Sequence, residues 1–422
     1  TIAAGSAAFT ITANGSKFTS NSVVRWNGQD LMTAFGSATQ LTAQVPANLV
    51  ANQGTAQVIV FTPAPGGGAS GAQTFTIGPG GPNPTPSITV LNPPAVGIGQ
   101  PDFNMIIHGT GFIGSSQAQI NGVNRTTTSV SSTKLSVAVL AADIPNAAGN
   151  VQVKVINPPS GSGGGGTSNM VNLRVVPKFT TVSAASFANP SALTADSIGA
   201  GFGLGIGNGT SFATNLPLPT NLNGTEVKVT DSMGTERPAG LFFVSGPANQ
   251  INYRVPPDTA NGMATAVVTL NGNIVAAGPV NVVSLAPALF AFRGDGKGVV
   301  AGVALRVQGA AQKFDIIYDL QNGTFVPKPI DLGPDTDIVY LIAFGTGMRN
   351  NSGPAGITVD FGNGMTKTLR ADFSEGCFAS PDLIGVDQCN IYMPRTLVGA
   401  GLLNMKLTID SKATNIVQIA VK

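Results

Sequence analysis

The chain contains an internal repeat. Residues 9–18 read FTITANGSKF and residues 103–112 read FNMIIHGTGF. The matched pairs are Phe9 with Phe103, Gly15 with Gly109, Phe18 with Phe112, Asn27 with Asn121, Gly28 with Gly122, Leu41 with Leu135, Val45 with Val139 and, after one inserted residue, Val58 with Val153 and Val60 with Val155. A solenoid unit is only about 20–50 residues long, so a repeat spaced this widely predicts tandem domains.

Residue patterns within the copies are typical of β-strands. In VQVKVI, Val151, Val153 and Val155 alternate with polar residues, which places the valines on one face of a strand. The 54 glycines and 29 prolines suit many short strands joined by tight turns. Because 42% of the residues are hydrophobic, the chain has enough apolar surface to fold rather than remain disordered. We therefore predict an all-β fold.

A second, weaker duplication follows Pro177. QINYRVP and QCNIYMP are each followed by a glycine-containing turn and an alternating strand, and upstream of them GAGFGLG resembles YLIAFGTG. Between the two clearer copies, GPGGPNPTP has the proline spacing of a semi-rigid linker. A chain of 422 residues also exceeds one ordinary domain. We predict four β-sandwich domains in an elongated array, at residues 1–78, 87–177, 178–284 and 285–422, with a linker at 79–86.

The first two copies resemble IPT/TIG domains, which are immunoglobulin-like sandwiches with a G-x-x-F turn after an early strand. That turn is GSKF in the first copy and GTGF in the second, and the resemblance covers residues 1–177. The rest of the chain resembles a carboxy-terminal region of secreted acidobacterial proteins, through VSAASF, LFFVS, QINYRVP and APALF, which begin at Val182, Leu241, Gln250 and Ala286. The resemblance implies tandem immunoglobulin-like domains in a modular, extracellular or cell-surface structural protein without catalytic activity.

The first copy lacks a counterpart of PSITVLNPP (86–94), the opening strand of the second, because Thr1 aligns with Ala95. A sandwich without an edge strand exposes unpaired backbone and apolar core. Three explanations stay open: loss of an upstream segment, a strand donated by a neighbouring subunit, or a domain that tolerates the gap. The chain begins with Thr and shows no charged-then-apolar leader, so we interpret it as a processed or truncated product.

Strand donation by a neighbour would make the chain a homopolymer. The residues that we expect to flank the open slot lie on the neighbouring strand, and they are Ala7, Phe9 and Ile11.

Two cysteines, Cys377 and Cys389, lie close together in the last predicted domain. A disulfide between them would stabilise the domain by about 3 kcal/mol and would favour an oxidising, extracellular location. Two reduced thiols and half of a metal site are the alternatives. A metal site is disfavoured because no further Cys or His is nearby. We expect the disulfide and no metal.

Candidate catalytic residues are few. The single histidine, His108, aligns with Asn14, so its position accepts a different polar residue, and a Ser/His/Asp triad elsewhere is excluded. GFGLGIGNGT (201–210) resembles a dinucleotide-binding loop, but Pro217 and Pro219 prevent the helix that must follow such a loop. These residues favour a structural role over an enzymatic one.

Two further short patterns have simple structural interpretations. Asp335 and Asp337 form the closest carboxylate pair, in GPDTD before a strand, where a turn or a calcium ligand is the expected role. The tripeptide at 293–295, Arg-Gly-Asp, lies within FRGDGKG, which is typical of a glycine-rich hairpin turn. We therefore predict no enzyme, no catalytic residue and no cofactor.

The composition of the chain excludes some classes of binding partner. Charged residues make up 10% of the chain and the net charge is +2, so there is no electrostatic footprint for nucleic acid or an anionic membrane. No apolar run reaches the roughly eighteen residues of a membrane span. Trp26 aligns with Ile120, which predicts a core position, and the four tyrosines form no obvious platform, although a polysaccharide partner stays open.

Taken together, these patterns predict an extracellular structural subunit that assembles with itself or with other surface proteins. The alternative is an adhesion or glycan-binding tail of a larger secreted protein.

Overall fold

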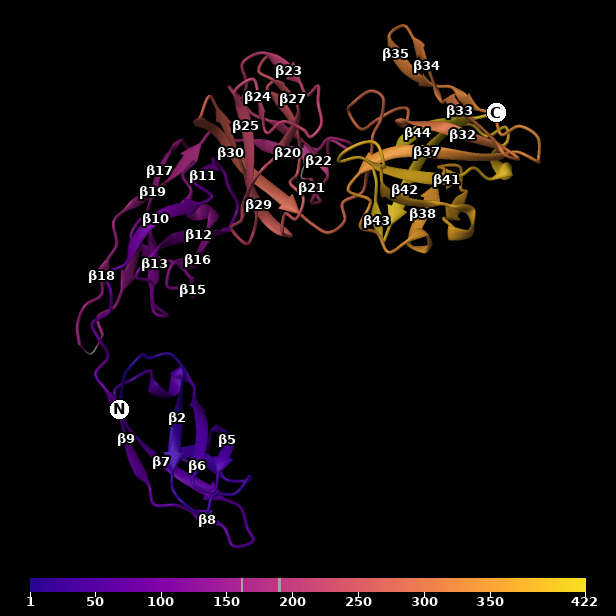
Figure 1. Cartoon of the computed structure of the whole chain (residues 1–422). Helices are drawn as coiled ribbons and strands as arrows, with labels where there is room; N and C mark the ends of the chain where they lie inside the picture. The colour runs from indigo at the N-terminus through magenta and orange to yellow at the C-terminus, as the bar shows by residue number, and fades with distance from the viewer. Residues whose placement is uncertain (161, 189–190) are drawn as a thin grey trace.

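A computed structural model of the chain describes residues 1–160, 162–188 and 191–422. Within them the chain is all-β, as predicted, and it forms four β-sandwiches that follow one another in a curved row (Figure 1). We call them sandwich 1 to sandwich 4 in chain order. The helical elements of these residues are short 3-10 turns, namely η1 (Ala47–Val50), η2 (Ala141–Asp143), η3 (Pro354–Gly356), η4 (Ala371–Phe373) and η5 (Arg395–Leu397).

Sandwich 1 packs a sheet of six strands against a sheet of three. The first sheet comprises β1 (Ile2–Ala3), β9 (Gln73–Gly78), β7 (Gly54–Thr62), β3 (Val23–Trp26) and β4 (Gln29–Asp30), with β8 (Gly68–Ala69) beside β7. The second comprises β2 (Phe9–Asn14), β6 (Gln40–Val45) and β5 (Met32–Ser37). The core between them is small and contains Trp26, which is almost completely buried.

Sandwich 2 repeats this arrangement with one strand more. Its first sheet comprises β10 (Ser87–Asn92), β12 (Phe103–Thr110), β16 (Lys134–Val139) and β15 (Thr127–Ser131). Its second comprises β11 (Ala95–Gly97), β19 (Val171–Val176), β17 (Gly149–Asn157), β13 (Gln117–Ile120) and β14 (Val123–Asn124), with β18 (Gly166–Thr167) beside β17. In β17, Val151, Val153 and Val155 all lie in the core, as their alternation predicts.

Sandwich 3 also has two sheets around one core. One comprises β20 (Thr180–Ser183), β22 (Ile198–Phe202), β28 (Gln250–Arg254), β27 (Gly240–Ser245) and β23 (Thr210–Phe212). The other comprises β21 (Ala192–Leu193), β30 (Asn273–Val282), β29 (Gly262–Leu270), β25 (Thr225–Thr230) and β24 (Asn221–Leu222), with β26 (Glu236–Pro238) beside β25.

Sandwich 4 is the largest, and a hairpin stands off its body (Figure 1). One sheet comprises β33 (Ala311–Ile316), β32 (Gly302–Gln308), β37 (Ile338–Thr346), β41 (Asp387–Tyr392) and β40 (Gly376–Ala379), with β31 (Ala288–Leu289) beside β37. The other comprises β36 (Pro329–Ile330), β44 (Val417–Val421), β42 (Gly401–Ile409), β38 (Ile357–Asp360) and β39 (Thr366–Thr368), with β43 (Lys412–Ala413) beside β42. The hairpin is formed by β34 (Tyr318–Gln321) and β35 (Thr324–Pro327).

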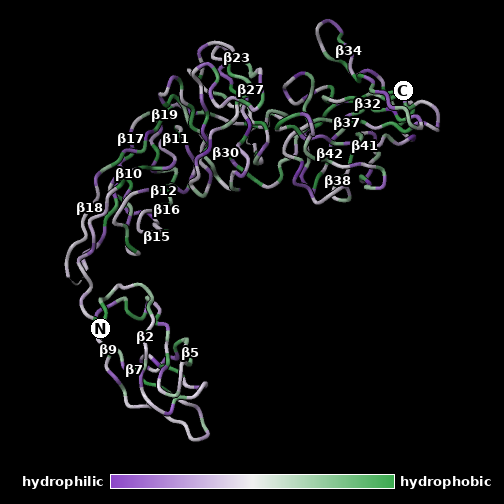
Figure 2. Tube along the Cα trace, viewed as in Figure 1, coloured by the Kyte–Doolittle hydropathy of each residue, from purple (hydrophilic) through white to green (hydrophobic). Residues whose placement is uncertain are grey.

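Hydrophobic and hydrophilic residues interleave along the strands of all four sandwiches, as Figure 2 shows. This is the pattern of strands that turn one face to a core and the other to solvent.

The weaker duplication is visible in a repeated side-chain contact. In β28, the side-chain amide of Gln250 donates a hydrogen bond to Oδ1 of Asn252 at 2.8 Å. In β41, Gln388 donates the same bond to Asn390 at 2.8 Å. Both strands pair with the strand formed by the upstream member of the duplication, β22 in one case and β37 in the other. Sandwiches 3 and 4 therefore share this local arrangement as well as the sequence pattern.

The junctions between sandwiches differ in tightness. Between sandwiches 2 and 3, Ala95 and Val176 pack against Val267 and Ala277 as one buried cluster. The linker instead binds sandwich 2, because the side chain of Asn83 donates to the carbonyl oxygen of Pro158 at 2.7 Å. Among the described residues, no hydrogen bond joins residues 1–78 to residues 87–177. Sandwich 1 is thus connected to the rest of the row mainly by the first residues of the linker.

Candidate functional site

One sheet edge is open in sandwich 1 and covered in sandwich 2. The sheet order is β10-β12-β16-β15 in sandwich 2 and β2-β6-β5 in sandwich 1. Phe9 lies opposite Val45 in β6 just as Phe103 lies opposite Val139 in β16, so β2 is the counterpart of β12. No strand of the described chain takes the place of β10 beside β2.

Strand β10 shows what such an edge requires. It runs antiparallel to β12, with Leu91 opposite Ile107 and Ile88 opposite Gly109. Ile88 and Leu91 are only 3% and 4% exposed and belong to the core. A Cβ atom on Gly109 would lie 2.0 Å from the carbonyl oxygen of Ser87, so the glycine permits the close approach of β10.

In sandwich 1 the same position is a groove of about 700 Å³. At Gly15, the counterpart of Gly109, an added Cβ would meet only the ring of Phe18 and no neighbouring strand. Apolar side chains line the groove from both sheets: Ile11, Ala13 and Phe18 from the side of β2, and Val58, Val60 and Phe75 from β7 and β9.

These lining residues are the ones that sandwich 2 buries. Their counterparts are each 3% exposed or less: Met105, Ile107, Phe112, Val153, Val155 and Leu173. In sandwich 1, by contrast, Ile11, Ala13, Phe18, Val58 and Phe75 are only partly buried. The groove is therefore a core that lacks its covering strand. It carries no charged side chain, and Lys17 lines the depression next to it.

Phe9 and Ile11 lie on β2 and point toward the core, where the ring of Phe9 lies tilted against that of Phe75 at a centroid distance of 5.9 Å. Ala7 lies before β2 and is exposed, so it is not part of the strand that borders the groove. Sequence reasoning did not single out the apolar residues that β7 and β9 contribute. The register of the repeat could have found them, because Val58 and Val60 match buried positions of the second copy.

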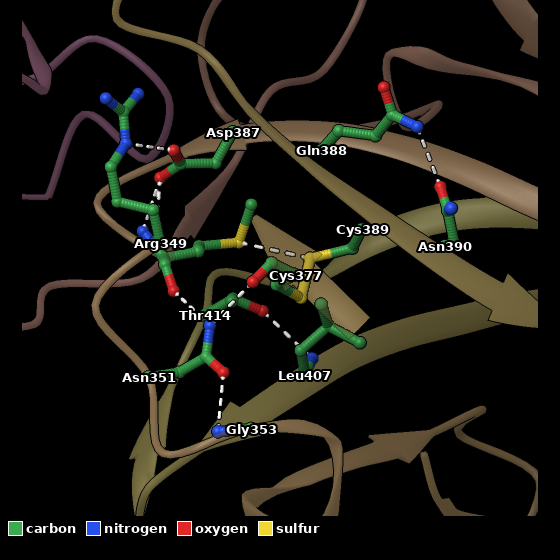
Figure 3. The surroundings of a disulfide bond; sticks show 11 residues. Arg349, Asn351, Gly353, Cys377, Asp387, Gln388, Cys389, Asn390, Leu407 and Thr414 are labelled. Atoms are coloured by element: carbon green, nitrogen blue, oxygen red, sulfur yellow. Dashed lines mark hydrogen bonds and ion pairs between the residues drawn. A yellow bond between two sulfur atoms is a disulfide. The ribbon is translucent and has the colours of Figure 1, made fainter. Parts of the chain in front are cut away.

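Cys377 and Cys389 form a disulfide between neighbouring strands β40 and β41 (Figure 3). Both residues are buried in the core of sandwich 4. Beside them, the carboxylate of Asp387 accepts hydrogen bonds from the backbone N–H of Met348 at 2.5 Å and from Nε of Arg349 at 2.5 Å. The arrangement holds β40, β41 and the end of β37 together and exposes no reactive thiol.

His108, Asp335 and Asp337 were considered as catalytic residues, and the structure gives their positions. His108 lies within β12, opposite Lys134 of β16. Asp337 is buried and accepts a hydrogen bond from Arg306 at 2.7 Å, whereas the side chain of Asp335 is fully exposed. Within residues 1–160, 162–188 and 191–422, no group of three or more His, Cys, Asp or Glu side chains is arranged to hold a metal ion.

One aromatic cluster was not foreseen from the sequence. Tyr392 lies 6.1 Å from Tyr340 and 5.2 Å from Phe373 between ring centroids. The ammonium group of Lys367 sits 4.7 Å from the Tyr392 ring centroid and is paired with Glu375. Burial lowers the pKa of Lys367 despite that pairing, and burial together with Glu375 raises the pKa of Tyr340.

Residues 2–77, which form almost all of sandwich 1, match the IPT/TIG domain family. No curated protein sequence matches the chain. Across the described residues, the structure contains no helix of sufficient length and apolar character to cross a membrane.

Three solved structures illustrate what the whole chain is similar to. The tetra-tandem repeat of the extending region of a large adhesion protein is 14% identical, with 98% of this chain and 95% of that chain covered and a TM-score of 0.22. The Bacteroides ovatus mixed-linkage glucan utilization protein SGBP-B, solved with a mixed-linkage heptasaccharide, is 11% identical, with 100% and 91% covered and a TM-score of 0.18. The eight N-terminal Ig domains of Down Syndrome Cell Adhesion Molecule are 12% identical, with 95% and 44% covered and a TM-score of 0.17. No function follows from likenesses this distant.

Proposed function

We propose that this chain is a non-catalytic, extracellular structural subunit whose sandwich 1 accepts a β-strand from a neighbouring molecule along β2. The observation that carries the proposal is the difference between two copies of one fold in the same chain. Sandwich 2 covers its edge with β10, and sandwich 1 leaves the matching groove uncovered.

A strand in the groove would gain apolar burial and backbone hydrogen bonds. Burying two side chains like Ile88 and Leu91 contributes about 1.5–3 kcal/mol each, and each new backbone hydrogen bond along β2 adds about 0.5–1.5 kcal/mol. These gains offset part of the loss of translational and rotational freedom on association, which is estimated at about 4–15 kcal/mol. Strand addition uses main-chain hydrogen bonds for affinity and side-chain pockets for specificity, and the groove offers both.

An extracellular location is part of the proposal. The buried disulfide of Cys377 and Cys389 fits an oxidising compartment, where such bonds form and persist. Its placement inside the core of sandwich 4 fits a structural rather than a redox role.

Light scattering combined with negative-stain electron microscopy tests assembly. We expect wild-type protein to form species of high mass and the Phe9→Asp variant to remain a monomer of 42.6 kDa, because a carboxylate beside the groove opposes burial of an apolar strand. The matched control is Thr10→Asp, which places the same charge on the exposed face of β2. A monomeric wild-type protein at high concentration would refute assembly, and polymers of the Phe9→Asp variant would refute the groove as the site.

A second candidate function, polysaccharide binding, is favoured by the cluster of Tyr340, Phe373 and Tyr392, since aromatic rings provide large amphipathic contact surfaces. Affinity electrophoresis against a panel of polysaccharides, comparing wild type with Tyr392→Ala, tests it. Retardation of the wild type that Tyr392→Ala abolishes would support this function, and equal mobility of both proteins in every gel would exclude it.

A further inference from the structure

Strand β33 is a second open edge, at the other end of the molecule. It is the terminal strand in the order β33-β32-β37-β41-β40, and only β32 pairs with it in the described chain. Five of its six residues are exposed and the sixth, Asp315, is half-buried. Figure 1 shows β33 in sandwich 4, far along the row from β2 in sandwich 1.

The side chains of β33 divide by face. Phe314 and Ile316 are 60% and 53% exposed, although both are large and apolar. Lys313 and Asp315 lie on the opposite face and pair with each other at 2.7 Å. The strand thus presents two alternating apolar side chains on one face and a charged pair on the other.

The apolar face extends beyond β33. Phe314 lies opposite Leu305 of β32, which lies opposite Tyr340 of β37, and Ile316 lies opposite Val303 in the same way. These apolar side chains lie on the outer face of the sheet, since the side chain of the neighbouring Ala304 points into the core. An exposed apolar stripe on an outer sheet face is a candidate interaction surface.

We propose that β33 of a second copy of this chain is the strand that occupies the groove beside β2. This inference rests on the proposed function and names its donor. Phe314 and Ile316 would enter the groove as Ile88 and Leu91 do in sandwich 2. The six-stranded sheet of sandwich 1, which borders the groove through β7 and β9, would then cover the stripe that continues through Leu305.

A symmetric pairing of β2 with β2 of another copy fits less well. The inward side chains of β2, such as Phe9 and Ile11, already pack on the core of their own sandwich and are not free to fill a second groove. Phe314 and Ile316 have no core of their own to cover. Because the two edges differ and lie at opposite ends of the row, their pairing is head-to-tail, and such pairing builds a filament or a closed ring of many subunits rather than a symmetric dimer.

Mixing two variants tests whether β33 is the donor strand, and the result does not depend on the register in which β33 and β2 would pair. Phe9→Asp places a charge on β2 beside the groove and leaves β33 intact, and Phe314→Asp places a charge on β33 and leaves the groove intact. We expect each variant alone to be monomeric by light scattering, and an equimolar mixture to form a dimer of twice the 42.6 kDa chain mass and nothing larger. Leu320→Asp is the control, because Leu320 is equally exposed at 63% but lies on the hairpin beyond β33. It should polymerise like wild type.

Other outcomes overturn the inference in distinguishable ways. Polymers of Phe314→Asp with a folded circular dichroism spectrum would exclude β33 as the donor and leave the groove proposal standing. A dimer formed by Phe314→Asp alone would indicate symmetric β2 pairing. Loss of polysaccharide binding in Phe314→Asp with unchanged assembly would assign the stripe to a glycan. A monomeric wild type would remove both proposals together.

Discussion

Arg349 of sandwich 4 joins two aspartates from different sandwiches. It donates to Asp387 within its own sandwich and to Asp196 of sandwich 3, which also pairs with Arg254. Burial raises the pKa of the Asp387 carboxyl, and hydrogen bonds from Met348 and Arg349 oppose that effect by stabilising the ionised form. The guanidinium therefore neutralises a buried charge and ties the last two sandwiches together.

Arg349→Ala should destabilise sandwich 4 and loosen its junction with sandwich 3. Removing one partner of a buried pair leaves an uncompensated charge, so we expect a loss of about 3–5 kcal/mol in the free energy of unfolding, measured by urea denaturation. The control is Arg370→Ala, since Arg370 pairs with Asp372 at the surface and such pairs contribute about 0–1 kcal/mol. Equal stability of the two variants would show that Asp387 does not depend on Arg349.

Asp231 predicts an acid-sensitive step in sandwich 3. Burial alone would raise its pKa, but hydrogen bonds from the backbone N–H of Thr235, Ala260 and Met233 and from Arg237 outweigh burial and hold the pKa below its usual value. Because the folded-state pKa is depressed, ionised Asp231 contributes stability that is fully present above about pH 4 and is lost as the pH falls through the folded-state pKa. We expect Asp231→Asn to lower the free energy of unfolding at pH 7 by about 1–3 kcal/mol.

The comparison that isolates this effect is between pH 7 and pH 2.5. The difference in the free energy of unfolding between wild type and Asp231→Asn should shrink at the lower pH, because wild-type Asp231 then begins to lose its charge. The control is Asp319→Asn, at an exposed position, which should have the same free energy of unfolding as the wild type at both pH values. If the difference in the free energy of unfolding stays constant with pH, the charge of the Asp231 carboxylate is not what stabilises sandwich 3.

Gly97 should control the junction between sandwiches 2 and 3. A Cβ atom there would lie 2.0 Å from the carbonyl oxygen of Ala277, so Gly97→Ala has to displace backbone across the junction. Overpacking of this kind costs about 1–3 kcal/mol. We expect a lower melting temperature and a changed small-angle scattering profile. At Gly114 an added Cβ meets no atom within 4 Å, so Gly114→Ala should leave the melting temperature and the scattering profile unchanged. If Gly114→Ala changes them as Gly97→Ala does, the contact at the junction does not cause the effect of Gly97→Ala.

Features that repeat along the chain were predictable from sequence because both copies obey the same local rules. Asn27 and Asn121 both adopt a left-handed conformation before glycine. Each also accepts a hydrogen bond through its side-chain oxygen from a backbone N–H of the facing strand, that of Gln57 at 2.8 Å and that of Gln152 at 2.9 Å. That no described strand pairs with the outer edge of β2 was likewise predicted from the comparison of the two copies.

Contacts between distant strands were not predictable in the same way. The edge-to-face contact of Tyr340 with Tyr392 depends on which strands become neighbours in a sheet, and alternation within one strand does not determine this. The bridge from Arg349 to Asp196 depends on how two sandwiches meet, and neither residue belongs to a repeated motif. The exposure of Phe314 depends on the edge position of β33 in its sheet, which no local sequence pattern determines.

A strand supplied within the same chain should close the groove and stop assembly. In sandwich 2, PSITVLNPP (86–94) directly precedes Ala95, the residue that aligns with Thr1. A variant with these nine residues placed before Thr1 has the connectivity of sandwich 2, so the added strand can pair with β2 and direct its Ile and Leu into the groove. We expect a monomer by light scattering and a rise of several degrees in the melting temperature of sandwich 1, because a local strand competes at a high effective concentration.

The control for this variant carries the same extension with its Ile and Leu replaced by Asp. Its added segment keeps the length and turn residues but cannot bury apolar side chains, so it should assemble like the wild type. If the PSITVLNPP extension folds onto sandwich 1, as judged by the higher melting temperature, and polymers still form, then assembly uses a surface other than the β2 edge. If neither extension changes melting temperature or mass, the groove does not accept a strand of this type.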